Sequence, residues 1–421
     1  MNGADRELNV LINAYAVSPN WGSEQGMGWH WVTNIAKYCH VDVITEGEWK
    51  DEIEDSLKNL PQKKNLRFHY LPVSARIRKM CWNQGDWRFY WHYQRWQRRA
   101  LELAKVICED QRIDIIHQLN MIGFREPGYL WSIKDIPFVW GPIGGMELMP
   151  MSYLRGASRK QILFNRIKNI VNRYQYTHSA RVRYAIERSA VLIAAVKGVK
   201  DVLSDIYNRE SVLINETGST IDDTITRACG RQDTPLKVLW VGKFDFRKQL
   251  AIALRTLIAT GRKNIELHIC GIGSESVMAK MKAIAEAGGI GTQCYWHGNV
   301  SHDKILGMMA QSDLLFFTSI MEATSTVVLE AISVGLPILS FNTCGFGPLV
   351  KNFAGITIEV SDPDRSVQDF ARELMKLEEN RAILDRVSEL IVEKRHMLTW
   401  DSKAKEVVKL YKEAIRPDNQ V

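Results

Sequence analysis

The sequence has little cysteine and no long apolar run. Its 421 residues include seven cysteines, which are widely spaced and form no Cys-x-x-Cys pair. This pattern does not favour a disulfide framework or a structural zinc site, so we expect a reducing, cytoplasmic environment. No stretch reaches the ~18 consecutive apolar residues of a membrane-spanning helix. The N-terminus lacks the basic flank and small-residue cleavage site of a signal peptide.

Acidic residues are scarce in one part of the chain. Residues 151–200 carry 11 lysines and arginines but a single acid, Glu187. Residues 1–210 hold 30 basic against 22 acidic side chains, whereas the remainder holds 25 against 26. This asymmetry predicts an anionic partner for the first half, such as a membrane surface, an acidic substrate or nucleic acid.

Short β-branched runs alternate with amphipathic helical stretches along the whole chain, and this pattern is typical of doubly wound parallel sheets. The expected strands of the first half are 8–17, 41–45, 66–73, 113–119, 137–143, 191–196 and 211–215. Those of the second half are 236–244, 265–273, 294–300, 313–319, 337–342 and 355–360. With 46% hydrophobic and 24% charged residues, the composition is that of a globular α/β protein.

The polar segment 216–235 separates the two series of strands and ends at Pro235. We therefore expect a Rossmann-like domain over 1–215, a linker over 216–235, a second Rossmann-like domain over 236–399 and a cleft between the domains. A C-terminal helix at about 400–417 could pack back on the first domain. Ligands of such sheets bind at the carboxyl ends of the strands, so the loops there are the places to search.

The segment 319–335 carries the strongest signal of a site. A strand is followed by Glu322, by the small residues 323–326 and by a helix that contains Glu330. A helix N-terminus with small residues favours an anionic phosphate, and carboxylates accept hydrogen bonds from sugar hydroxyls. The alternative is a capping Glu followed by a solvated surface Glu.

This Glu-x7-Glu segment resembles the signature of the retaining nucleotide-sugar glycosyltransferases of family 4 (glycosyl transferases group 1). The flanking stretches GNVSHDKILGMMAQSDLLFFTS and EAISVGLPILSFNTCGFGPLV agree with it, and WVGKFDFRKQL resembles the family's phosphate-binding turn. The stretches SPNWGSEQGMGW and WGPIGGMELMP resemble a subgroup from bacterial surface-polysaccharide clusters. The resemblance runs from residue 8 to about 412. It implies the GT-B architecture of two facing Rossmann-like domains.

The resemblance also implies roles for single residues. Glu322 matches the residue near the donor sugar and Glu330 the residue that holds the ribose. Lys243 and Lys248 match the pair that neutralises the diphosphate, although Lys243 stands where many members have Arg, so bidentate pairing is lost there. The other residues expected at the donor are Gly271, Ala323, Thr324, Ser325 and Thr326.

In the first half the resemblance is looser. The residues Gly22, Ser23, Glu24 and Gly26 match the family's Gly-rich loop, which approaches the donor phosphate and the acceptor, but there is no adjacent Gly-Gly pair. Many members have two histidines here, spaced by one residue, and the second meets the sugar site. His117 stands at the first position and Leu119 at the second, so the role could fall to His117, to Asn120 or to neither. A catalytic role for His117 and a structural one both remain open.

Neither a cofactor nor a metal is expected. Gly271 and Gly273 form an incomplete dinucleotide fingerprint. Asp362 and Asp364 form an Asp-x-Asp, but a helical run follows them, so helix capping is the better interpretation.

Two other stretches could bind a partner at the protein surface. Residues 82–103 alternate aromatics with Arg, which more often indicates a packed amphipathic helix than a nucleic-acid site, so we expect no nucleic acid. Residues 155–183 hold eight basic side chains and no acid, and could lie on anionic lipid at the inner face of the cytoplasmic membrane or form a solvated face.

Together these features predict a retaining, metal-independent glycosyltransferase. It would move a sugar from a nucleotide diphosphate sugar, such as a UDP- or GDP-sugar, to a hydroxyl of a glycan or lipid-linked acceptor in bacterial polysaccharide synthesis. The alternatives are a catalytically silent glycan- or nucleotide-sugar-binding protein of the same fold, and a NAD-dependent oxidoreductase, which the incomplete fingerprint opposes.

Overall fold

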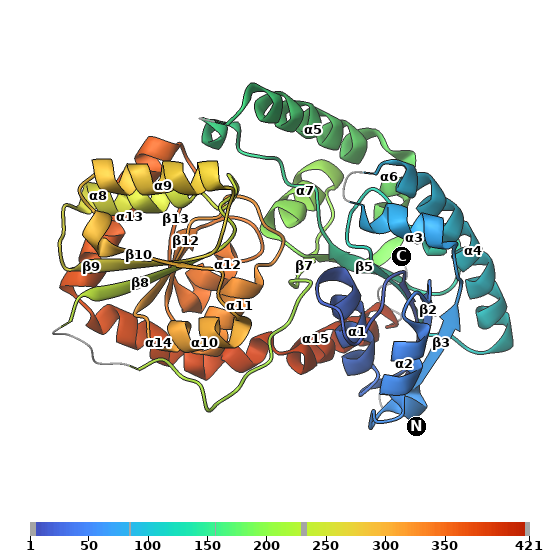
Figure 1. The fold of residues 1–421 in the computed structure, drawn as a ribbon. Helices are drawn as coiled ribbons and strands as arrows, with labels where there is room; N and C mark the ends of the chain where they lie inside the picture. Colours follow the sequence, from blue (N-terminus) through green and yellow to red (C-terminus); the bar gives the residue numbers. More distant parts are fainter. Residues whose placement is uncertain (1–5, 84–85, 156, 229–233, 417–421) are drawn as a thin grey trace. The chain divides into compact units, whose positions relative to one another are not determined.

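The chain folds into two compact units, each built around its own parallel sheet (Figure 1). The computed structural model describes residues 6–83, 86–155, 157–228 and 234–416. The first unit comprises residues 1–147, 171–217 and 400–421, and the second comprises 148–170 and 218–399. Residues 148–170, which the sequence-based division placed in the first domain, group with the second unit. Each of the thirteen predicted strands has a counterpart in the two sheets.

The first unit contains a seven-stranded parallel sheet of order β3-β2-β1-β4-β5-β6-β7. Its strands are β1 Leu8–Ala14, β2 Cys39–Thr45, β3 Leu66–Tyr70, β4 Ile115–Asn120, β5 Phe138–Ile143, β6 Ser189–Ala194 and β7 Val212–Leu213. Its helices are α1 Ser23–Ile35, α2 Lys50–Leu57, α3 Ala75–Trp82, α4 Arg88–Asp110, α6 Ala180–Arg188, α7 Lys197–Tyr207 and α15 Trp400–Ala414. The strand order reverses between β1 and β4, the place where such sheets bind ligands.

The second unit contains a six-stranded parallel sheet of order β10-β9-β8-β11-β12-β13. Its strands are β8 Leu236–Val241, β9 Ile265–Cys270, β10 Cys294–Gly298, β11 Leu314–Phe317, β12 Ile338–Phe341 and β13 Gly355–Ile358. Its helices are α8 Leu250–Thr260, α9 Glu275–Ala287, α10 His302–Ala310, α11 Thr326–Ser333, α12 Gly347–Leu349, α13 Pro363–Glu379 and α14 Ala382–Lys394. Helix α5 (Arg159–His178) begins in this unit and ends in the first. No helix of the described residues is long and apolar enough to span a bilayer.

The C-terminal helix α15 packs on α1 within the first unit. The ring of Trp400 stacks on His30 with 4.8 Å between centroids, and Asp401 accepts hydrogen bonds from Lys37 Nζ (3.0 Å) and Tyr38 Oη (2.8 Å). The Tyr411 side chain at the other end of α15 is fully buried. The chain therefore returns after the second unit to complete the core of the first.

The aromatic and Arg-rich stretch that was expected to form an amphipathic helix is part of α4. Phe89, Tyr93 and Trp96 are buried in the core of the first unit, whereas Trp91 is 55% exposed. The helical interpretation is thus confirmed, and three of the seven large rings in residues 82–103 pack in the core, whereas Trp82, Trp87, Tyr90 and Trp91 are exposed.

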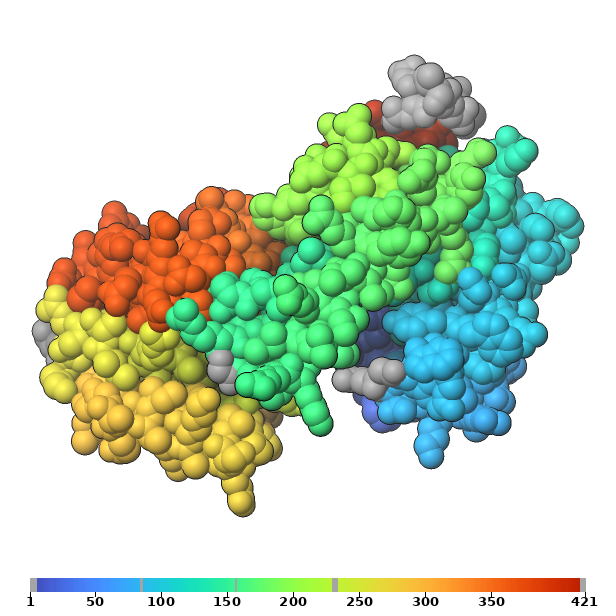
Figure 2. All heavy atoms as spheres, turned by 90° about the horizontal axis from the view of Figure 1, so that it is seen from above, coloured from blue at the N-terminus to red at the C-terminus, as the bar shows by residue number. Residues whose placement is uncertain are grey.

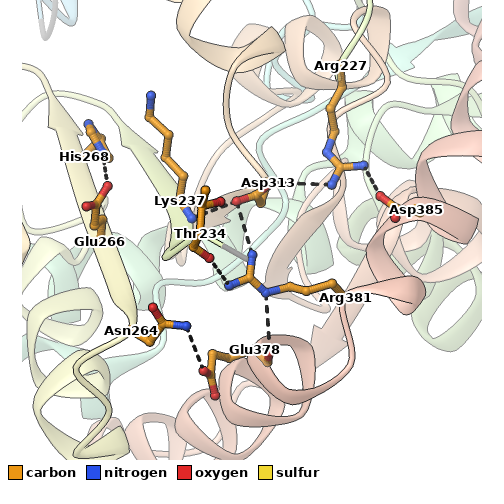
Figure 3. A network of polar contacts seen from close by, with 10 residues as sticks. All are labelled: Arg227, Thr234, Lys237, Asn264, Glu266, His268, Asp313, Glu378, Arg381 and Asp385. Carbon is orange, nitrogen blue, oxygen red and sulfur yellow. Dashed lines mark hydrogen bonds and ion pairs between the residues drawn. The ribbon is translucent and has the colours of Figure 1, made fainter. Parts of the chain in front are cut away.

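A buried ion network holds the segment around Arg227 to the sheet of the second unit (Figure 3). Asp313 accepts a hydrogen bond from Lys237 N (2.8 Å) and forms ion pairs with Arg381 (3.5 Å) and Arg227 (3.7 Å). Arg227 also pairs with Asp385 at 3.0 Å. Burial of such charges is tolerated because each faces an opposite charge or an acceptor.

Candidate functional site

The centre of the second unit's candidate site is an ion pair between Lys248 and Glu322. Lys248 Nζ lies 2.7 Å from Glu322 Oε1, and the two side chains are only 14% and 18% exposed. Lys248 Nζ also lies 5.0 Å from the centroid of the Phe317 ring, within range of a cation–π contact. The geometry thus brings together two residues that the sequence predicted for the same ligand.

Backbone hydrogen bonds fix the two loops that carry this ion pair. The loop after β8 meets the loop after β11 where Ile320 N donates to Arg247 O (3.0 Å) and Thr318 Oγ1 donates to Lys248 O (2.7 Å). The strands β8 and β11 are neighbours in the sheet, so their carboxyl-end loops necessarily lie together. The site is therefore positioned by the sheet rather than by the loops alone.

The N-terminus of α11 follows Glu322 directly. Residues 323–326 lead into this helix, which begins at Thr326, and Glu322 N donates to Cys344 Sγ at 3.1 Å. Gly345 N donates to Ala323 O at 3.2 Å, which holds the small-residue turn in place. Backbone N–H groups at a helix N-terminus carry partial positive charge, so this turn can stabilise a phosphate beside Lys248.

Glu330 lies about one turn into α11 and, together with the predicted donor residue Thr326, lines a cavity of about 220 Å³ in the second unit. Its Oε1 lies 3.2 Å from His302 Nε2. Burial raises the pKa of Glu330, and the neighbouring His302 opposes that rise. Residues 218–220 and His302 also belong to the lining of this cavity. Sequence reasoning missed both, because neither lies in a motif with a fixed spacing to Glu330.

The two other predicted donor residues have different surroundings. The side chain of Lys243 is exposed in the loop after β8. Gly271 has a φ of +145°, and a Cβ there would lie 1.8 Å from the carbonyl oxygen of Gly242. Only glycine permits this close approach of the loops after β8 and β9. Gly271 thus shapes the loop that carries Lys243, and its contact with a donor stays a prediction.

In the first unit the Gly-rich loop leads into α1, which starts at Ser23. A Cβ at Gly26 would lie 2.2 Å from Trp21 O, so close backbone packing requires glycine there, whereas Gly22 has open space. Glu24 Oε1 accepts a hydrogen bond from Ile122 N at 2.8 Å. Burial raises the pKa of Glu24 to about 7, with a further rise from Glu216 and a reduction from the Ile122 N–H.

Asn120 ties this loop to the end of β4. Its Nδ2 donates to Ala16 O (2.7 Å) and to Glu24 O (3.3 Å), and its Oδ1 accepts from Ala16 N (3.3 Å). Asn120 is fully buried. Its amide is therefore committed to the loop, and a direct contact with a sugar is disfavoured.

The structure also disfavours the catalytic role that the sequence left open for His117. This residue is fully buried, its Nδ1 lies 2.5 Å from Tyr411 Oη and its Nε2 lies 2.7 Å from Gly141 O. Burial lowers the pKa of His117 to about 4, so the ring is neutral at neutral pH. Both ring nitrogens are occupied, and the geometry favours a role in joining β4, β5 and α15.

The Asp-x-Asp pair caps a helix, as its sequence context predicted. Asp362 accepts hydrogen bonds from Asp364 N (3.0 Å) and Arg365 N (3.1 Å) at the start of α13. Asp364 forms ion pairs with Arg155 (2.8 Å) and Arg255 (2.6 Å). Within the described residues, no group of three or more His, Cys, Asp or Glu side chains could hold a metal ion.

Two Rossmann-like units, the second with the Lys248–Glu322 ion pair at its strand ends, define a fold class, and comparison with known proteins identifies it. Over 96% of this chain and 99% of the other, the fold matches the apo form of the lipopolysaccharide outer core galactosyltransferase WaaB, with a TM-score of 0.59 and 16% identity. It also matches Anabaena HepE in complex with UDP and glucose over 97% of this chain and 100% of the other, with a TM-score of 0.54 and 12% identity. The fold class is GT-B, as predicted.

The sequence family follows from residues 222–414, which match the family model described as "Glycosyl transferases group 1". That range covers nearly all of the second unit and α15, and it places this part of the chain in that family, which confirms the resemblance seen in the sequence. An uncharacterized glycosyltransferase of Methanocaldococcus jannaschii is 23% identical over 260 residues, which are 57% of this chain and 65% of that protein. The chain thus spans less than two thirds of that curated relative.

Proposed function

We propose that the chain is a retaining glycosyltransferase that moves a hexosyl unit from a nucleoside diphosphate sugar to a hydroxyl of a glycan or lipid-linked acceptor, without a metal. The proposal includes a place in the synthesis of a bacterial surface polysaccharide or lipopolysaccharide. The names of the compared proteins support this class, since one is a lipopolysaccharide galactosyltransferase and another was solved with UDP and glucose.

The observation that carries the proposal is the ion pair of Lys248 and Glu322 beside the N-terminus of α11. A leaving nucleoside diphosphate gains negative charge in the transition state. Lysine and preorganised backbone N–H groups stabilise that charge, and this electrostatic contribution usually dominates such catalysis. Glu322, held by Lys248, is placed to accept a hydroxyl hydrogen bond from the donor sugar.

In the proposed donor complex, these residues bind different parts of the nucleoside diphosphate sugar. Lys248 and the α11 N-terminus bind the diphosphate, the exposed Lys243 adds a second positive charge, and Glu330 in its cavity binds the ribose hydroxyls. We place no general base in the second unit. This fits a same-face mechanism in which the leaving phosphate accepts the proton of the acceptor hydroxyl.

A nucleotide panel tests the proposal. Isothermal titration of the full chain with UDP, GDP, CDP and ADP should show that at least one binds, and the matching sugar nucleotide should be hydrolysed slowly or transferred. Binding without any turnover would favour the catalytically silent alternative. If none of the four nucleotides binds, the proposal is overturned.

Helix α5 supports the further proposal that the acceptor is presented at a membrane. The buried residues of this helix carry polar groups: they are Asn165, Asn172 and Tyr176. The side chain of Asn169 also forms two hydrogen bonds of 2.9 Å with the backbone of Met149. The large apolar side chains of α5 are exposed instead: Ile162, Leu163, Phe164, Ile167, Ile170, Val171 and Tyr174. The amphipathic helix is thus turned with its apolar side outward.

An anionic bilayer is the surface that matches this helix. Its exposed apolar residues alternate with Arg159, Lys160, Arg166 and Arg173, and residues 155–183 contain no acid. A helix with apolar and basic residues on its outer side lies in the headgroup region of anionic lipid. Figure 2 shows this segment, in green, at the surface of the molecule.

A further inference from the structure

The first unit contains a cavity of about 370 Å³, and none of the residues predicted to bind the sugar donor lines it. It lies within the size range of ligand pockets, about 300–1,000 Å³. Its walls come from the first turn of α1, from α3 and α4 and from residues 121–126, which follow β4. The cavity therefore lies at the carboxyl ends of β1 and β4, where the strand order reverses and ligands are expected.

Aromatic rings line one part of this cavity. Trp87 and Tyr90 both belong to its lining, and they are 77% and 47% exposed. Rings of this size are normally buried or paired, so two exposed rings beside a cavity indicate a binding surface. The apolar face of a sugar ring can lie against such rings, while tryptophan N–H and tyrosine O–H remain available to its hydroxyls.

Two carboxylates, of Glu24 and Glu126, line another part of this cavity. Glu24 uses Oε1 for the hydrogen bond from Ile122 N, and the residue belongs to the cavity lining. Glu126 is 89% buried, pairs with Arg181 at 2.7 Å through Oε1, and leaves Oε2 without a hydrogen-bond partner within the described part of the chain. Buried acceptors of this kind normally have a donor, and Oε2 can accept a hydrogen bond from a ligand O–H group.

We infer that this cavity binds one neutral sugar ring of the acceptor, with Trp87 and Tyr90 against the face of the ring and Glu24 and Glu126 accepting hydrogen bonds from its hydroxyls. Its role as the acceptor site rests on the proposed function, but the binding of a sugar does not. The cavity lining holds three acidic side chains, those of Glu24, Asp86 and Glu126, against one basic side chain, that of Arg125, and this balance favours a neutral ring over a phosphate or a uronate.

Saturation-transfer NMR on the full chain tests this inference, with the methyl glycosides of glucose, galactose, mannose and N-acetylglucosamine as probes. At least one glycoside should give signals with the wild type. The double variant W87A/Y90A should lose them through a roughly tenfold or larger loss of affinity, since each ring contributes separately. Trp91→Ala is the matched control, because this exposed ring lies on α4 but outside the cavity lining. The glycoside should still give signals with this variant.

The carboxylates are tested by charge removal without loss of shape. Glu24→Gln keeps an oxygen for the Ile122 N–H but makes the group neutral, so sugar affinity should fall several-fold, whereas the exposed Glu109→Gln on α4 should change nothing. Wild-type chain that gives no signal with any glycoside, or W87A/Y90A chain that keeps full signals, overturns the inference.

Nucleotide addition separates this inference from the proposed function. The nucleotide that binds best should leave the glycoside signals in place. Displacement of the glycoside by the nucleotide would show that the sugar occupies the donor site, and would overturn the inference while supporting the proposed function. A glycoside that binds where no nucleotide does would leave the sugar site standing and reject the proposed function.

Discussion

Lys248 and Glu322 face each other at 2.7 Å although they come from loops after two different strands, β8 and β11. Most of each side chain is buried, so neither charge is fully screened by water. A diphosphate would give Lys248 a second anionic partner. The lysine then links the phosphate to the carboxylate that we assign to the donor sugar.

Lys248→Ala should weaken binding of the preferred nucleoside diphosphate by about 1.5–3 kcal/mol, the usual contribution of a charge-assisted hydrogen bond. Glu322→Gln should leave nucleoside diphosphate affinity close to that of the wild type, because no sugar is present, but should reduce transfer. Isothermal titration measures the first effect and initial rates the second. The control is Lys376→Ala on α13, where the lysine pairs with Glu373. Unchanged nucleotide affinity in Lys248→Ala would contradict the assignment.

The sequence was sufficient to predict the thirteen strands, because strand periodicity is a local property of an α/β sheet. The family resemblance implied that Lys248 and Glu322 serve one ligand, and the structure shows that their two strand-end loops are adjacent. The sequence was not sufficient to predict the structural role of His117, because its hydrogen-bond partner Tyr411 lies near the other end of the chain. It also could not show the orientation of α5. Periodicity defines an apolar face of a helix, but only the neighbouring polar groups decide that its asparagines lie inward.

The pH dependence of stability distinguishes a structural from a catalytic His117. The pKa of His117 is about 4 in the folded chain, below the 6.5 of an exposed histidine, because burial disfavours the charged ring. Below pH 6.5 the unfolded chain therefore binds a proton that the folded chain does not. The contribution of His117 to stability is complete above pH 6.5 and declines as the pH falls towards 4, by up to about 3 kcal/mol.

His117→Gln should reduce the stability of the first unit at pH 7.5 and flatten its decline between pH 6.5 and 4. Urea denaturation at several pH values, followed by hydrogen exchange of β4 and β5 amides, measures both effects. The same variant should keep its affinity for the nucleotide. Full stability combined with lost transfer would instead restore the catalytic interpretation.

Asp313→Ala should destabilise the second unit by about 3–5 kcal/mol, because it removes the buried carboxylate that faces both Arg381 and Arg227. Hydrogen exchange of β8 and β11 amides reports this loss. Glu389→Ala, an exposed position on α14, serves as the control and should stay within about 0.5 kcal/mol of the wild type. Equal stability of the two variants would show that the network adds nothing to the fold.

Transfer or donor hydrolysis should persist in EDTA, because in the proposed function lysines and a helix N-terminus offset the charge of the diphosphate. Asp362 is committed to the cap of α13 and Asp364 to two arginines. The measurement is the initial rate before and after chelation, with added Mn²⁺ as the second arm. Complete loss of activity that Mn²⁺ restores would show that a metal is required.

Helix α5 should bind the protein to anionic vesicles. Each Lys or Arg near such a surface contributes about 1 kcal/mol, and the exposed apolar residues of α5 add insertion into the headgroup region. Charges are screened within about 8 Å at physiological ionic strength, so raised salt should release part of the bound protein. Co-sedimentation with vesicles of anionic and of neutral lipid measures binding.

Replacing Arg155, Arg159, Lys160, Arg166 and Lys168 with Gln should abolish vesicle binding, and Leu163→Ser combined with Phe164→Ser should weaken it at every salt concentration. Both variants should keep nucleotide affinity, since the proposed donor residues lie on α11 and in the loops after β8 and β11. Gln at Lys58, Lys63 and Lys64, three exposed lysines of the first unit, is the control for loss of positive charge outside α5 and should still pellet. Wild-type protein that stays in the supernatant with anionic vesicles at low salt would make α5 a solvated face, and a glycan acceptor free of lipid would then fit the structure better.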